Sequence, residues 1–91
     1  MLYPEYTNQF KKDYKKCKKR GLPLEEIQHV MSLLIDEQEL PPKSKDHVLK
    51  GSYKGYGECH IRPDWLLIYL VKEKEGTIIF TRTGTHTDLF D

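Results

Sequence analysis

Hydrophobic positions near the start of the chain recur with the period of an α-helix. Phe10, Tyr14 and Cys17 form one stripe, and at about 100° per residue the lysines between them point away from it. Thr7 or Asn8 can cap this helix, because short polar side chains accept hydrogen bonds from a first turn. The pattern predicts a helix with one buried face and one basic, solvated face.

A second helix is expected after a short break. Gly21 suits the left-handed conformation that ends a helix, and Pro23 suits a first helical turn. The apolar positions that follow are three or four residues apart and make one broad face; they are Leu24, Ile27, Val30, Met31, Leu34 and Ile35. Leu40-Pro41-Pro42 ends this half, because proline disfavours helical conformation in the preceding residue. We therefore expect a helical hairpin that buries one side.

The pattern then changes to a period of two and to short apolar runs, which predicts strands. The expected strands are Tyr56–Arg62, Trp65–Lys72 and Thr77–Thr83, with a short extended segment near His47–Lys50 and turns at Pro63-Asp64 and Glu75-Gly76. The run WLLIYLV is apolar on both faces, so it should be a central strand covered on both sides. These elements predict one α+β domain over residues 1–91, with the helical hairpin packed on a small antiparallel sheet.

Composition narrows the class of protein. A chain of 91 residues can bury one modest core, and 32% charged with 37% hydrophobic residues is typical of a globular domain. No apolar run approaches the roughly 18 residues of a membrane span. The first ten residues have no apolar core of a secretion signal and no small-residue cleavage site. We therefore expect a cytoplasmic protein that does not interact with membranes.

The net charge of +1 conceals an uneven distribution. Residues 11–20 carry seven basic groups and one acid, a net charge of +6, whereas the other 81 residues carry −5. A lysine-rich helix face is often only solvated, but it also has the charge that binds nucleic-acid phosphates. Lys50 and Lys54 alternate with Tyr53, Tyr56 and three glycines, a mixture that can stack on and contact RNA. Trp65 lies in an apolar run, which favours a core position over base stacking.

Three of the four histidines fall in the sheet half: His47, His60 and His86. His29 lies opposite the apolar face of the second helix and should be solvated. Asp64 follows His60 across a turn, so the two can approach each other at one end of a hairpin, with Arg82 on the neighbouring strand. Imidazoles, a carboxylate and a guanidinium suit proton transfer next to a phosphate. The alternative is that each histidine has a structural or surface role.

A zinc site is a competing use of the same residues. Cys59 and His60 are neighbours on a strand and point to opposite faces, so they could not easily share one ion. The metal-binding spacings C-x2-C and H-x3-H are absent from the sequence. Catalysis by a Cys59 thiolate is also disfavoured, because Glu58 and Asp64 would raise the pKa of the thiol. Cys17 and Cys59 are expected to be two free thiols rather than one disulfide.

Three motifs together resemble the YafQ branch of the RelE-like toxins of bacterial type II toxin–antitoxin pairs. They are D-H-x-L-x-G, E-C-H-I-x-P-D-W and R-T-G-T-H-x-x-L-F, and with the two helices the match covers nearly the whole chain. The resemblance implies a RelE-like microbial ribonuclease fold and an mRNA interferase, an endoribonuclease that cleaves messenger RNA in the ribosomal A site and inhibits translation. It implies as partners the ribosome, mRNA and a RelB- or DinJ-like antitoxin, with operator DNA bound only through the antitoxin complex. We expect the antitoxin to be acidic, or to present acidic and apolar segments, and to cover the basic face or the histidines.

The resemblance also assigns site residues. The family's functional positions fall on His47, His60, Asp64, Arg82, His86 and Phe90, and Trp65 occupies a position that the family associates with the site. The RNA- and ribosome-binding residues would be Lys11, Lys12, Lys15, Lys16, Lys18, Lys19, Lys50, Lys54 and Trp65.

The implied reaction requires no metal and no cofactor. A base removes the proton of the 2′-OH, the oxygen attacks phosphorus, and an acid protonates the 5′-oxygen, which leaves a 2′,3′-cyclic phosphate. His86 is assigned as the acid and either His60 or His47 as the base, while Asp64 orients or charges a histidine and Arg82 stabilises the phosphorane.

Two positions depart from the family pattern. Gly57 stands where members often carry a larger polar or basic residue, and Asp91 places a negative charge beside Phe90. The alternative function is a non-catalytic RNA- or ribosome-binding module, in which the lysine helix supplies the affinity and the histidines are incidental.

Overall fold

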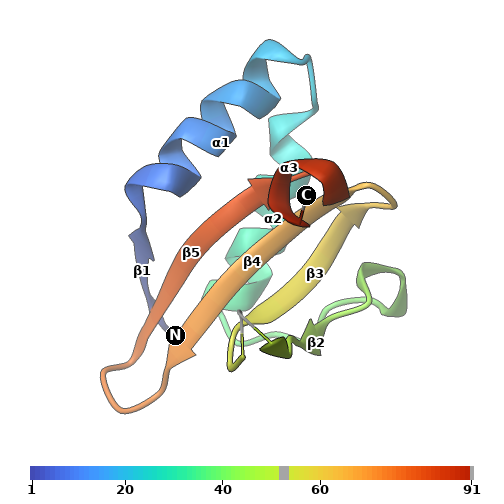
Figure 1. The fold of residues 1–91 in the computed structure, drawn as a ribbon. Coiled ribbons are helices and arrows are strands. Elements are labelled where there is room, and N and C mark those ends of the chain that lie inside the picture. Colours follow the sequence, from blue (N-terminus) through green and yellow to red (C-terminus); the bar gives the residue numbers. More distant parts are fainter. Residues whose placement is uncertain (52–53, 91) are drawn as a thin grey trace.

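A computed structural model describes residues 1–51 and 54–90, and it confirms that two helices follow each other near the start of the chain (Figure 1). Thr7 caps helix α1 (Asn8–Lys19), because its hydroxyl oxygen accepts a hydrogen bond of 2.9 Å from the backbone N–H of Phe10. Gly21 follows the helix with a φ of +77°, a conformation that glycine adopts without strain. Helix α2 (Leu24–Ile35) starts directly after Pro23 and buries Ile27, Val30, Met31 and Leu34.

A five-stranded sheet has the order β1-β5-β4-β3-β2. Three strands match the predicted ranges to within one residue: β3 (Gly57–Arg62), β4 (Trp65–Lys72) and β5 (Thr77–Gly84). Strand β2 (His47–Val48) occupies part of the expected extended segment. Strands β2 to β5 pair antiparallel in sequence order. The predicted α+β architecture is therefore confirmed.

Strand β1 (Tyr3–Tyr6) lies outside the predictions, and it pairs parallel with β5, so the sheet is mixed rather than wholly antiparallel. Its sequence does not signal a strand. Tyr3 is aromatic but 76% exposed, so apolar and polar residues do not mark a buried and a solvated face, and Pro4 argues against a strand because it has no backbone N–H. The strand forms because β5 offers an unpaired edge, where Tyr3 lies opposite Thr77. A 3-10 turn at Pro42–Ser44 and a short helix α3 (His86–Phe90) are further elements that the pattern does not predict.

Strand β4 lies in the centre of the sheet and is covered on both faces, as predicted. Trp65, Leu67 and Tyr69 join the main core with residues of α1 and α2. Leu66 and Ile68 point to the other face, where Leu89 of α3 covers them in a smaller cluster. Figure 1 shows α2 and α3 on opposite sides of the sheet. We call the side that carries α3 the α3 face.

Both cysteines are free thiols, as predicted, and the structure buries both of them. Burial raises the pKa of the Cys17 thiol, and it raises the pKa of the Cys59 thiol much further. Within residues 1–51 and 54–90, no helix has the length and apolar character needed to cross a membrane.

Candidate active site

The strand register brings the predicted catalytic residues of the sheet to the α3 face. Residues directly opposite each other in antiparallel strands share a face, and His47 lies opposite Glu58, which lies opposite Ile68. Ile68 in turn lies opposite Arg82, so one row crosses four strands. His60 belongs to the next row of the same face, opposite Leu66 of the smaller cluster.

Glu58 lies between two histidines. Its Oε1 atom is 3.4 Å from Nε2 of His47 and 3.7 Å from Nε2 of His60, and its side chain is only 7% exposed. Nδ1 of His47 is 2.6 Å from the carbonyl oxygen of Lys45, and because a carbonyl can only accept, this nitrogen carries the hydrogen and donates. In the neutral His47 ring, Nε2 is therefore the atom that takes up a proton.

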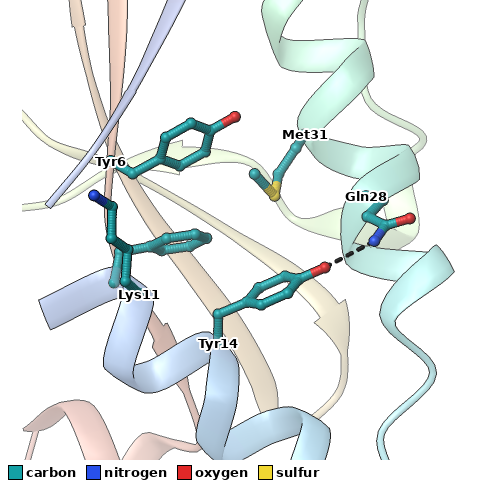
Figure 2. A pocket seen from close by; sticks show the side chains of 6 residues that line it. Tyr6, Lys11, Tyr14, Gln28 and Met31 are labelled. Carbon is teal, nitrogen blue, oxygen red and sulfur yellow. Dashed lines mark hydrogen bonds between the residues drawn. The ribbon is translucent and has the colours of Figure 1, made fainter. Parts of the chain in front are cut away.

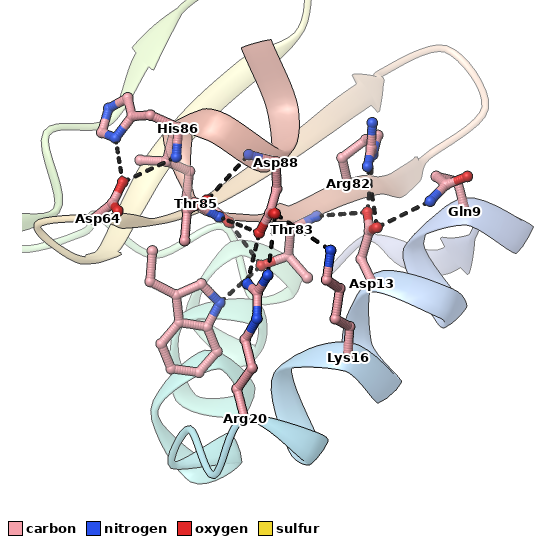
Figure 3. Close-up of polar contacts among 12 residues, drawn as sticks. Gln9, Asp13, Lys16, Arg20, Asp64, Arg82, Thr83, Thr85, His86 and Asp88 are labelled. Atoms are coloured by element: carbon pink, nitrogen blue, oxygen red, sulfur yellow. Dashed lines mark hydrogen bonds and ion pairs between the residues drawn. The ribbon is translucent and has the colours of Figure 1, made fainter. Parts of the chain in front are cut away.

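Asp64 binds His86 rather than His60, the histidine that its position in the hairpin suggests. Its Oδ1 atom accepts hydrogen bonds from the backbone N–H of His86 at 2.9 Å and from the His86 ring at 2.6 Å (Figure 3). These bonds hold the pKa of Asp64 below its usual value, and the bond from the backbone N–H has the largest effect. An ionised carboxylate only accepts, so Nδ1 of His86 carries a hydrogen and Nε2 is its exchangeable position.

The two sets of residues meet at the histidine rings. The ring centroids of His60 and His86 are 5.9 Å apart with an interplanar angle of 65°. One end of the cluster is thus a buried carboxylate with two histidines, and the other end is an exposed carboxylate with one. Two separately supported imidazoles at this spacing can perform complementary proton transfers.

Arg82 is held by helix α1. Its Nε and Nη2 atoms donate to the two carboxylate oxygens of Asp13, at 2.9 and 3.1 Å (Figure 3). Asp13 is buried and lies in the middle of the lysine-rich segment. The sequence shows the charge of this residue but gives no sign of its partner, which is 69 positions away.

The other predicted residues have different surroundings. Trp65 is 2% exposed, and its indole N–H donates to Thr83 Oγ1 at 3.0 Å, so it occupies the core position that its spacing favours. Phe90 is 49% exposed at the end of α3. His29 is exposed, as predicted. The lysines predicted to bind RNA are also exposed; they are Lys11, Lys12, Lys15, Lys16, Lys18, Lys19, Lys50 and Lys54. Tyr53 and Asp91 lie outside the described residues.

Gly57 faces the main core rather than the histidines. It lies opposite Tyr69, and a Cβ atom at this position would be 2.4 Å from Cζ of the Tyr69 ring. The Tyr69 hydroxyl donates to Asp46, the residue before His47. The space that a larger residue would need is therefore filled by a tyrosine that ties β4 to the segment carrying His47.

Glu58 and Asp13 lie in the candidate site, and the sequence reasoning assigns neither of them a role there. Glu58 could have been found, because a strand residue two positions before His60 shares its face. Among the described residues, no three His, Cys, Asp or Glu side chains are arranged to share a metal ion.

A separate hollow of about 400 Å³ lies on the other side of the sheet, between β1, α1 and α2 (Figure 2). Its walls are mostly aromatic and apolar, and Gln28 donates to the Tyr14 hydroxyl at 2.8 Å across it. It is lined by Tyr6, Phe10, Lys11, Tyr14, Gln28 and Met31. This set contains no histidine and no carboxylate, so the candidate catalytic chemistry belongs to the α3 face.

Known proteins resemble the chain over its whole length. The family described as bacterial toxin of type II toxin-antitoxin system, YafQ, matches residues 2–91. The mRNA interferase toxin YafQ of Escherichia coli K12 is 45% identical over 87 residues, which cover 94% of this chain and 92% of the relative. YafQ in the crystal structure of the E. coli DinJ-YafQ toxin-antitoxin complex is 42% identical with a TM-score of 0.90, over 99% of this chain and 98% of that one. A metal-bound toxin from Helicobacter pylori is 44% identical with a TM-score of 0.93, over 99% and 100%.

Proposed function

The chain belongs to the YafQ family of type II toxins, and from this premise we propose that it is a ribosome-dependent endoribonuclease that cleaves mRNA in the ribosomal A site. The observation that carries the proposal is the close approach of two imidazole rings that have different carboxylate partners. His60 lies beside Glu58, and His86 lies beside Asp64. Cleavage of a translated message would stop protein synthesis in the cytoplasm. A non-catalytic RNA-binding module would have no need of such an arrangement.

The proposed reaction uses the two ends of the cluster as base and acid. His47 or His60 removes the proton from the 2′-OH, and the buried Glu58 carboxylate beside both rings stabilises the imidazolium that forms. His86 protonates the 5′-oxygen from Nε2, while Asp64 fixes the tautomer and the orientation of the ring. Arg82 stabilises the negative charge that develops on the phosphoryl oxygens of the phosphorane. Phe90, exposed at the end of α3, would contact the RNA.

We propose an antitoxin and the ribosome as macromolecular partners. The relative from E. coli forms a complex with the DinJ antitoxin, and we expect a DinJ-like protein with acidic and apolar segments to bind this chain. The exposed lysines of α1 give the molecule the basic surface that ribosomal RNA would contact.

The test is cleavage of an mRNA in a translating extract, mapped by primer extension. The change His86→Ala should abolish cleavage at codon boundaries while ribosome binding persists, because the side chain is 55% exposed and its removal should leave the fold intact. His29→Ala, at an exposed position on α2, is the matched control and should cleave like the parent. Cleavage by His86→Ala at the parent's rate would refute the assignment, and binding without cleavage by the parent would favour the RNA-binding module.

Metal dependence is tested in the same assay. Excess EDTA, with ribosomes kept intact by a controlled magnesium concentration, should leave the cleavage rate of the parent unchanged. A loss of cleavage that zinc or copper restores would show that the reaction uses a metal.

A further inference from the structure

One face of α1 holds the segment that bears Arg82 and His86. Asp13 and Lys16 of α1 and Arg20, the residue at its C-cap, are spaced three and four residues apart, so their side chains lie on one side of the helix, which we call the α1 stripe. All three bind residues between 82 and 88 (Figure 3). A helix whose basic surface suggests only RNA binding thus also contacts the proposed catalytic segment.

The first contact is the pair of Asp13 and Arg82. The Asp13 side chain is 8% exposed and accepts four hydrogen bonds, two from the Arg82 guanidinium, one from Gln9 and one of 3.2 Å from the backbone N–H of Thr83. Two parallel bonds fix both the position and the plane of a guanidinium. The backbone bond to Thr83 fixes the strand at the next residue.

The second contact joins α1 to α3. Arg20 donates to both carboxylate oxygens of Asp88, at 2.7 and 3.2 Å, and Lys16 lies 3.4 Å from the same group. Asp88 and Thr85 exchange hydrogen bonds of 3.0 and 3.1 Å, each backbone N–H to the other side chain, which caps α3. His86 is the first residue of that helix, so the ion pairs to Asp88 hold the helix on which His86 lies.

We propose that Asp13 is a positioning residue for Arg82 in RNA cleavage, and that the α1 stripe orders the segment from Arg82 to Asp88 before substrate binds. The inference rests on the proposed function, because Arg82 must act on the scissile phosphate. An arginine side chain has many rotamers, and a guanidinium held in one of them need not be ordered at the transition state. A group that is fixed in advance accelerates the chemical step more than it tightens binding of the substrate.

The experiment is a double-mutant cycle measured on programmed ribosomes, with kcat and KM determined separately. Arg82→Ala should lower kcat by about 10²–10³-fold, as loss of a donor to developing charge commonly does. Asp13→Asn should lower kcat about tenfold and leave KM within about threefold. The double variant should cleave as slowly as Arg82→Ala alone, because Asp13 acts through Arg82. Asp36→Asn, the same change at an exposed position, should match the parent.

The outcomes separate the two proposals. If Arg82→Ala cleaves like the parent, the role of Arg82 in the proposed function fails. If Arg82→Ala is slow but Asp13→Asn retains the parent's kcat, or if the two losses multiply in the double variant, the positioning role of Asp13 is refuted.

Should Asp13→Asn alone fail to fold, guanidinium rescue decides the question, because the double variant has no uncompensated buried charge. Millimolar guanidinium should accelerate cleavage by Arg82→Ala, where the Asp13 carboxylate can bind it, and should not accelerate cleavage by the double variant. Urea is the neutral control. Equal rescue of both variants, or rescue of neither, would overturn the inference.

Discussion

Replacing Gly57 by alanine tests how tightly β4 is tied to the segment before β2. The new Cβ atom would be 2.4 Å from Cζ, 2.6 Å from Cε2 and 2.7 Å from the hydroxyl oxygen of Tyr69. Carbon atoms in contact are about 3.5–4.0 Å apart, so the ring would have to retreat by about 1 Å. The ring is 8% exposed and belongs to the main core, so a shift of this size disturbs its neighbours. It also displaces the hydroxyl that donates to Asp46.

The expected cost has two parts. Overpacking of a well-packed core costs about 1–3 kcal/mol, and a weakened hydrogen bond to a carboxylate adds about 1–2 kcal/mol. The free energy of unfolding should fall by about 2–5 kcal/mol. In a domain of this size about 4–8 °C corresponds to each kcal/mol, so we expect Tm to fall by at least about 8 °C. Because Asp46 precedes His47, cleavage should also slow at temperatures where Gly57→Ala remains folded.

Urea unfolding followed by circular dichroism measures the change in free energy, and the background variant Tyr69→Val supplies the control. Without the ring, Gly57→Ala should be neutral or stabilising by about 0.5 kcal/mol, because alanine loses less backbone entropy than glycine on folding. The sign of the effect therefore depends on whether Tyr69 is present. An equal loss of stability in both backgrounds would refute the reasoning.

Three further predictions concern the core, acid stability and the thiols. Trp65→Phe loses a buried hydrogen bond from its indole N–H and should reduce the free energy of unfolding by about 1–3 kcal/mol; an unchanged urea midpoint would contradict this. Hydrogen bonds from Arg20 hold the pKa of Asp88 well below its usual value, so this carboxylate stabilises the fold above about pH 4 and loses that contribution as the pH falls further. Thermal melts should show a steeper loss below about pH 4 in the parent than in Asp88→Asn. Cys17 and Cys59 should not react with an aromatic disulfide reagent until urea unfolds the protein, and rapid reaction of the native protein would disprove their burial.

The helices and central strands could be predicted because their signals are local. The cap at Thr7, the break at Gly21 and the apolar run of β4 each depend on a few adjacent residues. Strand β1 depends on an edge that β5 provides 74 positions later, and its own residues alternate poorly. Spacing along the chain does not encode that partnership.

The sequence could indicate which histidines and charged residues lie in the candidate site, but only some of their contacts. His60 and Asp64 are close in sequence, but the turn into α3 brings the backbone N–H and ring of His86 to Asp64. Nothing in the sequence indicates that Asp13 is buried, because a charged residue among the lysines of a basic helix is normally solvated. Its burial follows from a contact with Arg82, on a strand at the other end of the chain.

The parallel pairing of β1 with β5 constrains the order in which a nascent chain can assemble. Tyr3 has its partner only when Thr77 has left the ribosome, so residues 3–6 are made before the strand with which they pair. The helical hairpin can form early from local contacts, but the sheet edge and the segment from Arg82 to Asp88 are completed together. Assembly of the histidine cluster is therefore delayed until late in synthesis. A chain that has not yet been made as far as His86 lacks the cluster, and the fold is completed only after β5 has been translated.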